Sequence, residues 1–413
     1  MKLGLIGYPL GHSWSPAIHR FFLKQDCYRK YELKEEELEA FVRSSDLDGY
    51  NVTIPYKQKI MAYLDEIEEH AAAIGAVNTV VNRNGKRFGA NTDYIGFLKM
   101  LEGNGIEASG RHFAVLGDGG ASKAVQAALR TLGAGYDIVK RRPKEGVITF
   151  EEMYEREAAY HGIINATPVG MSPKDEETPA DLSRFSHIES VVDVVANPLV
   201  TKLLFEAKLA GLKTCGGFEM LVRQALAADE FFTGKKMDES TVKPCMDALL
   251  RERRNIVLIG MPTSGKSTIA RKIAKTTGRD LLEMDMILEK RLGTSIRTCF
   301  ETKGEAYFRM KESDLAEEIN PVGAVVSCGG GVVKNERNMQ MLARNGRIYW
   351  IDRRPENLFA SDDRPLSSKR SDLEALYEER KDLYARYCDV RIDNNGSLQD
   401  AVKAILADLG EGA

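Results

Sequence analysis

Residues 260–267 have a spacing that can bind phosphate. They read Gly-Met-Pro-Thr-Ser-Gly-Lys-Ser, with an apolar, β-branched run at 255–259 before them and apolar residues at helical spacing after them. A strand, a glycine-rich turn and a helix N-terminus together surround phosphate groups with backbone N–H donors. In such a loop Lys266 reaches the terminal phosphates and the Ser267 hydroxyl holds Mg²⁺. A turn without a ligand is the alternative, but both flanking runs fit a binding loop. The predicted loop residues are Thr263, Ser264, Gly265, Lys266, Ser267 and Thr268.

A second glycine-rich turn lies far upstream, at residues 117–121, between a strand predicted at 112–116 and a helix that ends near Leu132. This is the place of a pyrophosphate-binding turn in a dinucleotide-binding domain. The next predicted strand ends in Lys140-Arg141-Arg142, beginning 23 positions beyond Gly117, where NAD-binding domains usually carry an acidic residue. Three cations suit a 2′-phosphate, so we predict NADP(H). A basic strand end that is merely solvated is the alternative.

Polar side chains in the first hundred residues could bind a small hydroxylated acid. Each of them alone is typical of helix caps and turns. Together they offer uncharged hydrogen-bonding groups, one lysine and one aspartate, which suit a polyhydroxylated carboxylic acid. The set consists of Ser13, Ser15, Asn51, Thr53, Lys57, Asn78 and Asp93.

These residues must be positioned by an α/β fold, because short apolar runs alternate with stretches of helical spacing. This rhythm predicts parallel sheets covered by helices. A charged run at 251–254 is the predicted boundary between two halves, which a short tether joins. Strands are predicted at 3–6, 77–81, 112–116, 136–139, 162–165, 191–194 and 255–259, and helices at 35–42, 60–67, 219–232 and 245–253.

The composition bounds the class of protein. A chain of 413 residues exceeds what one hydrophobic core supports. Its 43% hydrophobic and 29% charged residues are typical of globular domains, and a net charge of −3 argues against a nucleic-acid or membrane-surface protein. Six scattered cysteines without a C-x-x-C pair indicate reduced thiols, and no run approaches the roughly 20 apolar residues of a membrane span. We predict a cytoplasmic protein.

Motifs in the first part of the chain carry a family resemblance. GYPLGHSWSPAIH, GYNVTIPYK, GAVNTV, GANTD, LGDGGASKAV, INATPVGM and GGFEMLVRQ follow one another in this order. Over roughly residues 1–250 the chain thereby resembles the shikimate dehydrogenases. The resemblance makes Lys57 and Asp93 the catalytic pair, because hydride arriving at a ketone creates an alkoxide that must take a proton. It assigns the substrate to Ser13, Ser15, Asn51, Thr53, Asn78 and Gln224. It assigns NADP(H) to Gly117, Asp118, Gly119, Gly120, Ala121, Lys140, Arg141, Arg142, Thr167, Val194 and Gly217.

The region from about residue 254 to 410 resembles shikimate kinase, a P-loop enzyme. The resemblance gives the substrate carboxylate to Arg309 and Arg380, for which the planar guanidinium is suited. It gives close approach to the substrate ring to Gly330, and orientation or deprotonation of the reacting hydroxyl to Asp285. Arg364, on a lid, would reach the ATP phosphates. Phosphoryl transfer needs mainly positioning and charge neutralisation, which Lys266, Mg²⁺ and an arginine supply.

The chain departs from both families at a few positions. Asp118 replaces an alanine of the glycine turn, Lys140-Arg141-Arg142 replaces Asn-Arg-Thr, and Ala196 stands where a tyrosine is usual. In the kinase region Glu283 replaces an aspartate and the lid segment is short. Two alternatives therefore stay open. The first half could be a quinate/shikimate dehydrogenase that uses NAD, or one half could be a degenerate module that binds shikimate and regulates its neighbour.

Taken together, the sequence predicts a bifunctional α/β enzyme. NADPH would reduce 3-dehydroshikimate to shikimate, and ATP with Mg²⁺ would phosphorylate the shikimate. Its partners would be small-molecule substrates, without nucleic acid or membrane, and a homodimer is left open. The predicted domains are a substrate domain over 1–100 completed by helices at 219–250, a Rossmann NADP-binding domain over 101–218, and a P-loop kinase domain over 254–413.

Overall fold

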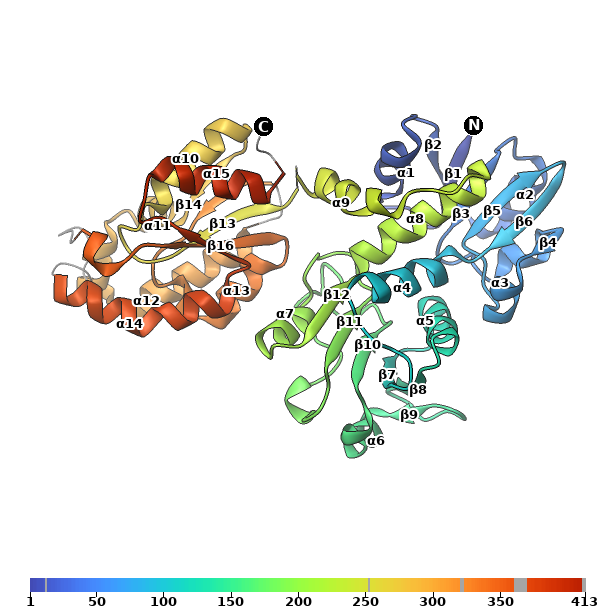
Figure 1. The fold of residues 1–413 in the computed structure, drawn as a ribbon, viewed down its shortest axis with the longest axis horizontal. Coiled ribbons are helices and arrows are strands. Elements are labelled where there is room, and N and C mark those ends of the chain that lie inside the picture. Colours follow the sequence, from blue (N-terminus) through green and yellow to red (C-terminus); the bar gives the residue numbers. More distant parts are fainter. Residues whose placement is uncertain (12, 252, 320–322, 360–369, 411–413) are drawn as a thin grey trace. The chain divides into compact units, whose positions relative to one another are not determined.

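The computed structural model describes residues 1–11, 13–251, 253–319, 323–359 and 370–410. The chain forms two compact units, Met1–Leu249 and Leu250–Ala413. The first unit contains two six-stranded sheets and the second contains one five-stranded sheet (Figure 1). The division between the units falls inside helix α9 (Val242–Arg251).

The first sheet has the strand order β2-β1-β3-β5-β6-β4. Its strands β1, β2 and β3 are parallel, but β5 runs antiparallel to both β3 and β6. The prediction of parallel sheets is therefore wrong here. The reason is local, because Asn84 and Gly85 both have positive φ and close a two-residue hairpin between β5 and β6. The strands are β1 (Leu3–Gly7), β2 (Tyr28–Glu32), β3 (Gly49–Val52), β4 (Glu66–Ile67), β5 (Thr79–Arg83) and β6 (Lys86–Ala90).

The helix predicted at 60–67 is also wrong. The structure has a short 3₁₀ helix at Lys59–Tyr63, followed by β4. Strand β4 pairs with β6, so the edge of the sheet takes the backbone hydrogen bonds that a helix would have used. Around this sheet lie α1 (Ser15–Leu23), α2 (Leu38–Ser44) and α3 (Glu69–Ile74), and α4 (Thr92–Gly103) follows β6.

The second sheet is parallel throughout, in the order β12-β11-β10-β7-β8-β9. The order reverses at β7, and open parallel sheets bind ligands beyond the carboxyl ends of the strands at such a point. Its strands are β7 (His112–Leu116), β8 (Gly135–Lys140), β9 (Ile148–Thr149), β10 (Gly162–Asn165), β11 (Ser190–Asp193) and β12 (Lys213–Gly216). Its helices are α5 (Gly120–Thr131), α6 (Phe150–Glu155) and α7 (Lys202–Leu209), whereas α8 (Gly217–Thr233) follows β12 and packs on α4 and on α1 of the first sheet.

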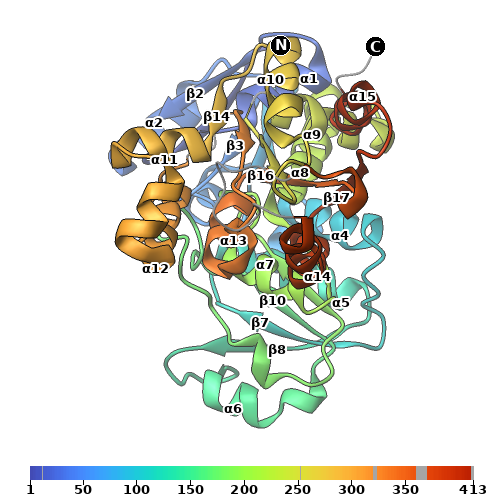
Figure 2. The same cartoon turned by 90° about the vertical axis from the view of Figure 1, so that its left-hand side faces the viewer.

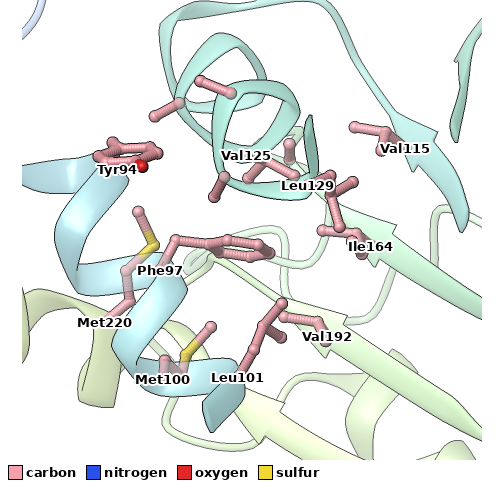
Figure 3. Close-up of a cluster of buried hydrophobic side chains, with 14 of the residues drawn as sticks. Tyr94, Phe97, Met100, Leu101, Val115, Val125, Leu129, Ile164, Val192 and Met220 are labelled. Carbon is pink, nitrogen blue, oxygen red and sulfur yellow. The ribbon is translucent and has the colours of Figure 1, made fainter. Parts of the chain in front are cut away.

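Helix α4 packs into the core of the second sheet. Phe97, Met100 and Leu101 on α4 are fully buried against α5 and the strands of that sheet, as Figure 3 shows. Burial of large apolar side chains at this density holds the helix firmly, at roughly 1.5–3 kcal/mol per side chain. Asp93, in the first turn of α4, is thus carried by a rigid element.

The second unit has a parallel sheet in the order β14-β15-β13-β16-β17, with β13 in the middle. Figure 2 shows α11 and α12 together at one side of this unit, with α13 next to α12. No helix in the described part of the chain is both long and apolar enough to cross a membrane. The strands are β13 (Asn255–Ile259), β14 (Leu281–Glu283), β15 (Val325–Ser327), β16 (Gly346–Asp352) and β17 (Val390–Asp393). The helices are α10 (Lys266–Thr277), α11 (Met284–Leu292), α12 (Ile296–Glu318), α13 (Glu336–Ala343), α14 (Arg370–Tyr387) and α15 (Leu398–Asp408).

Candidate active sites

Lys57 and Asp93 form a close ion pair in the first unit. The Lys57 Nζ donates a hydrogen bond of 2.6 Å to Asp93 Oδ2, and the two side chains are 22% and 14% exposed. Lys57 lies in the loop after β3, and its carbonyl accepts a bond from the Val77 N–H. Asn91 caps α4 by accepting from the Tyr94 N–H, which fixes the turn that holds Asp93. The pair can therefore hold a proton at a fixed place that solvent still reaches.

A buried amide network contains three predicted substrate residues. Asn78 Oδ1 accepts from the Thr92 N–H at 2.7 Å, and Asn78 Nδ2 donates to Gln224 Oε1 at 3.4 Å. The Thr92 hydroxyl donates to the same Gln224 oxygen, and Asn51 Nδ2 donates to the Thr79 hydroxyl at 3.0 Å. Asn51 lies on β3, Thr92 on α4 and Gln224 on α8. Asn78 directly precedes β5, which begins at Thr79. The network fixes which amide atom donates and which accepts.

Tyr28 links this network to the predicted carboxylate cradle. Its hydroxyl donates to Asn51 Oδ1 at 2.7 Å and also shares a hydrogen bond with the Ser15 side chain. Ser15 is buried, and its N–H donates to the Ser13 hydroxyl at 3.2 Å. Burial raises the pKa of Tyr28 well above its ordinary value, so the hydroxyl keeps its proton. The sequence did not predict Tyr28, because a tyrosine in a strand is ordinary sheet material.

Two further residues support Tyr28 from behind. The ring of His19 stacks on Tyr28 at 4.1 Å, and His19 Nδ1 lies 2.7 Å from Asp229 Oδ1. Both side chains of this pair are fully buried.

Thr53, the remaining predicted substrate residue, follows β3, and its N–H donates a hydrogen bond to the carbonyl of Ile6.

A cavity of about 560 Å³ lies beyond the carboxyl ends of β7, β8 and β10. Gly117 has a φ of +101° and turns the chain from β7 toward α5. A Cβ placed on Gly119 or Gly120 would meet no atom within 4 Å, so the N-terminus of α5, with Ala121 in its first turn, has open space for an anion. The cavity is lined by Gly117, Val139, Lys140, Arg141, Arg142, Pro143, Lys144, Phe150, Thr167, Val169 and Pro179.

Asp118 is engaged with the basic residues of this cavity. Its Oδ2 lies 3.3 Å from the ammonium groups of both Lys140 and Lys144. Partial burial acts to raise the pKa of Asp118, but the two lysines outweigh it and hold the pKa below its ordinary value. The carboxylate is therefore an anion at neutral pH.

The loops after β10 and β11 are joined by a buried carboxyl group. Asp193 accepts bonds from Asn165 Nδ2, from the Val195 N–H and from the Thr201 hydroxyl, at 2.7–3.0 Å. Burial raises the pKa of Asp193 to about 7. Asn165 Oδ1 in turn accepts two bonds from Thr167. The Val194 N–H donates to the Asn165 carbonyl at 3.0 Å, so the predicted cofactor residues Thr167 and Val194 are both bonded to Asn165.

Gly217 closes this arrangement from the other side. It is the first residue of α8, and a Cβ placed on it would lie 2.1 Å from the carbonyl oxygen of Val194. No larger residue fits without moving the backbone. The two predicted cofactor residues therefore lie in direct contact beside the second sheet.

The second unit has a cavity of about 220 Å³ at the phosphate-binding loop. Lys266 curls back over the loop, and its Nζ donates to the carbonyls of Gly260 and Met261 at 2.9 and 2.7 Å. Ser267 Oγ lies 3.4 Å from Ser327 Oγ. The cavity is lined by Thr263, Ser264, Gly265, Lys266, Ser267, Thr268, Asp285 and Cys328. Residues that can hold phosphate and a residue that can orient a hydroxyl thus share one space.

Arg309 is held between two glutamates of its own helix. It donates to Glu312 Oε2 at 2.8 Å and to Glu305 Oε1 at 3.1 Å. Glu312 is 1% exposed, and burial raises its pKa although Arg309 opposes this. The sequence did not single out these glutamates, yet their i−4 and i+3 positions relative to Arg309 are a usable signal.

Arg380 is 2% exposed and contacts the glycine loop. Its Nη1 donates to the carbonyl of Gly330 at 3.3 Å, and Tyr384 donates to the same oxygen. Its Nε and Nη2 have no hydrogen-bond partner among the residues that the structure describes. Buried guanidinium donors in this state favour an anionic ligand. A Cβ on Gly331 would lie 2.2 Å from Arg309 Nη2, so both arginines meet this loop.

Asp285 reaches the same glycine loop from α11. Its Oδ1 lies 2.7 Å from the position that a Cβ on Gly329 would take. Glu283, just before α11, accepts two bonds from Arg271 at 2.9 and 3.1 Å. Arg364, the predicted lid residue, lies outside the described residues.

Comparisons with known proteins identify both parts of the chain. Residues 5–80 match the family model for the shikimate dehydrogenase substrate binding domain. The chain is 40% identical over 259 residues to a shikimate dehydrogenase (NADP(+)) of Clostridium perfringens (strain SM101 / Type A), covering 58% of this chain and 96% of that protein. The chain belongs to the shikimate dehydrogenase family. Residues 262–410 match the family model for shikimate kinase, so the predicted resemblance is confirmed for both parts.

Solved structures agree with this assignment for the first unit. The shikimate 5-dehydrogenase of Thermus thermophilus, in complex with NADP(H) and shikimate, is 33% identical with a TM-score of 0.55, covering 59% of this chain and 98% of that one. The quinate dehydrogenase of Corynebacterium glutamicum, in complex with NAD, is 32% identical with a TM-score of 0.54, covering 60% of this chain and 99% of that one. The predicted α/β fold class with a Rossmann part is thereby confirmed.

Proposed function

We propose that the chain catalyses two consecutive reactions. The first unit reduces 3-dehydroshikimate to shikimate with NADPH, and the second phosphorylates shikimate at its 3-hydroxyl with ATP. The observation that carries the proposal is the placement of chemistry in each unit. The Lys57–Asp93 pair lies next to the amide network in sequence and space, while Lys266 and Asp285 line one cavity. The product of the first reaction is the substrate of the second, which supports both assignments together.

In the proposed reduction, NADPH supplies the hydride. Lys57 gives a proton to the oxygen that becomes the new hydroxyl, and Asp93 keeps the ammonium group in line at 2.6 Å. The amides of Asn51, Asn78 and Gln224 orient the ring hydroxyls. The substrate carboxylate would be bound by Ser13, Ser15 and Thr53.

In the proposed phosphorylation, ATP with Mg²⁺ supplies the phosphoryl group. Arg309 and Arg380 bind the shikimate carboxylate, since their guanidinium groups meet at the loop that contains Gly330. Asp285 orients the 3-hydroxyl and accepts its proton. Lys266 neutralises phosphate charge, and Ser267 is the protein ligand proposed for Mg²⁺. Arg364 remains part of the proposal as the lid residue.

A pair of variants in the full chain tests the proposal. Lys57→Ala should lower the reductase rate by about 10²–10⁴-fold and leave shikimate-dependent ATP consumption near its wild-type value, because only one site loses its acid. Lys266→Ala is the matched control and should give the opposite pattern. If Lys57→Ala keeps more than about a tenth of the reductase kcat, Lys57 is not the proton donor. If wild-type chain lacks either activity while still binding shikimate, that unit is a binding module.

A second candidate concerns the first unit alone. Ala196 stands where the family usually has a tyrosine, and a quinate dehydrogenase bound to NAD is among the similar structures. A quinate/shikimate dehydrogenase that uses NAD is the alternative. Comparing kcat/KM for quinate with NAD⁺ and for shikimate with NADP⁺ decides between the two, and we expect the second value to be larger.

The proposal includes the surroundings of the enzyme. All six cysteines are free thiols, which suits the reducing cytosol. The proposed substrates are small soluble acids, so the chain is proposed to act in the cytoplasm without a nucleic-acid or membrane partner. A homodimer is retained as a proposal that light scattering of the purified chain will test.

A further inference from the structure

Asp118 brings a negative charge into a basic site. It lies in the glycine-rich turn between Gly117 and Gly119, and its side chain is 20% exposed. The carboxylate reaches across to the end of β8, where its Oδ2 is 3.3 Å from Lys140 Nζ and from Lys144 Nζ. Both lysines line the cavity of about 560 Å³ at this edge of the sheet. One carboxylate thus pairs with two ammonium groups that face the proposed cofactor.

The end of the second strand of a dinucleotide-binding sheet is where the adenosine ribose is recognised. Domains that bind NAD place a carboxylate there to accept from the ribose 2′-hydroxyl, and domains that bind NADP place cations there for the 2′-phosphate. This chain has both kinds of group at the end of β8. Lys140, Arg141 and Arg142 supply the cations, and Asp118 supplies the carboxylate from the neighbouring turn.

The interaction with Asp118 should therefore be favourable for NADH and unfavourable for NADPH. A 2′-hydroxyl can donate a hydrogen bond to the carboxylate, and charge-assisted bonds of this kind are strong. A phosphate monoester carries a charge of about −1.5 to −2 at neutral pH and must share Lys140 and Lys144 with a fixed anion. Arg141 and Arg142 are exposed, and in the described part of the chain neither has an ion-pair partner, so they remain available to a 2′-phosphate.

We propose that Asp118 is a specificity-determining residue of the dinucleotide site. Its carboxylate accepts a hydrogen bond from the ribose 2′-hydroxyl of NADH and repels the 2′-phosphate of NADPH. The enzyme consequently accepts both cofactors. Its preference for NADPH is smaller than the preference that the positive charges of Lys140, Arg141, Arg142 and Lys144 would give without Asp118. This inference rests on the proposed reductase function of the first unit.

The test uses the full chain and three substitutions. Asp118→Ala removes the carboxylate, and Asp118→Asn keeps its shape and one acceptor oxygen but not its charge. Glu145→Gln is the matched control, because Glu145 is an exposed carboxylate next to Lys144 in the β8–β9 loop, with no hydrogen bond or ion pair within the described residues. Binding is measured by the fluorescence of the reduced nicotinamide of NADH and of NADPH, which adenine nucleotides at the kinase site do not produce. The ratio of kcat/KM for the two cofactors is measured with 3-dehydroshikimate.

For Asp118→Ala we expect the dissociation constant of NADH to rise about 10–100-fold, because a hydrogen bond to a charged acceptor is lost. The dissociation constant of NADPH should fall several-fold. Asp118→Asn should tighten NADPH in the same way and weaken NADH less. Glu145→Gln should leave the ratio of the two dissociation constants within about twofold of the wild-type ratio.

Two outcomes would overturn the inference. If Asp118→Ala leaves the ratio unchanged, the carboxylate does not discriminate between the cofactors. If the variant weakens NADPH, Asp118 instead positions the lysines for the phosphate. The failure of the proposed function looks different, since wild-type chain would then oxidise neither reduced nucleotide with 3-dehydroshikimate, whichever nucleotide it binds.

Discussion

Arg309 shows what a single side chain contributes by its shape as well as its charge. Glu305 and Glu312 hold its guanidinium group from both sides, so the group is pre-set before any ligand arrives. A planar fork can bind a carboxylate through two parallel hydrogen bonds, whereas an ammonium group binds it as a point charge. The pair of glutamates would hold a lysine as readily, so charge balance alone does not explain an arginine here.

Arg309→Lys should therefore impair phosphorylation although the charge is kept. We expect the apparent KM for shikimate to rise about 10-fold or more, the cost of one charged hydrogen bond, while the KM for ATP stays within about twofold. Steady-state kinase assays with each substrate varied in turn measure both values. Arg297→Lys, on an exposed part of the same helix, is the control. If Arg309→Lys keeps the wild-type KM for shikimate, Arg309 does not bind the substrate.

The sequence could predict residues that stand in motifs, and less of what surrounds them. Lys57 and Asp93 are 36 positions apart, yet each was singled out by its own segment, and the structure brings them to 2.6 Å. The sequence does not reveal Tyr28 or the His19–Asp229 pair, because their contacts join segments up to 210 positions apart. Such partners are decided by tertiary packing and leave no local pattern.

At the scale of elements, buried strands were the most predictable features. The strands expected at 112–116, 162–165 and 255–259 have these bounds in the structure, because a short β-branched apolar run covered on both faces has few alternatives. The helix predicted at 60–67 does not form, because Lys59–Tyr63 makes only a short 3₁₀ helix and Glu66–Ile67 pairs with β6 as an edge strand. The pair Asn84-Gly85 is a local signal for the β5–β6 hairpin, because both residues have positive φ.

Asp193 makes a prediction at this scale, since it joins the ends of β10 and β11. Its pKa is about 7 in the fold against an ordinary value of 3.8, so the folded unit favours the protonated acid. That contribution to stability is fully present below about pH 4 and is lost as the pH rises through 7. Between pH 5 and pH 8 the free energy of unfolding of the first unit should fall by roughly 2–3 kcal/mol more in wild type than in Asp193→Asn.

The two tryptophans of the chain allow this measurement. Trp14 lies in the first unit and Trp350 in the second, so Trp14 fluorescence in a Trp350→Phe background follows urea unfolding of the first unit alone. Subtracting the free energy of unfolding of Asp193→Asn from that of wild type cancels the contributions of groups that titrate in both proteins. A difference that is independent of pH over this range would show that Asp193 is ionised in the folded unit at all these values.

At the scale of the whole molecule, the chain is built from two units with separate sheets and separate core clusters. Ile256, Leu258 and Ile269 belong to the core of the second unit, and no residue of the first unit is among the described members of that cluster. Each unit also contains its own proposed substrate residues. Because a ligand stabilises only the cooperative unit that binds it, the two units should respond to different ligands.

We predict that NADP⁺ raises the unfolding midpoint reported by Trp14 and leaves that reported by Trp350 unchanged, with ADP and Mg²⁺ doing the reverse. At a ligand concentration of 100 times its dissociation constant, the stabilisation should be about 2.7 kcal/mol in the unit that binds it. Urea unfolding of the Trp350→Phe and Trp14→Phe chains measures the two transitions separately. Lys266→Ala is the control, because it should abolish the response to ADP alone. If NADP⁺ raised both midpoints equally, the chain would unfold as one cooperative unit, and the division at Leu249 would carry no thermodynamic meaning.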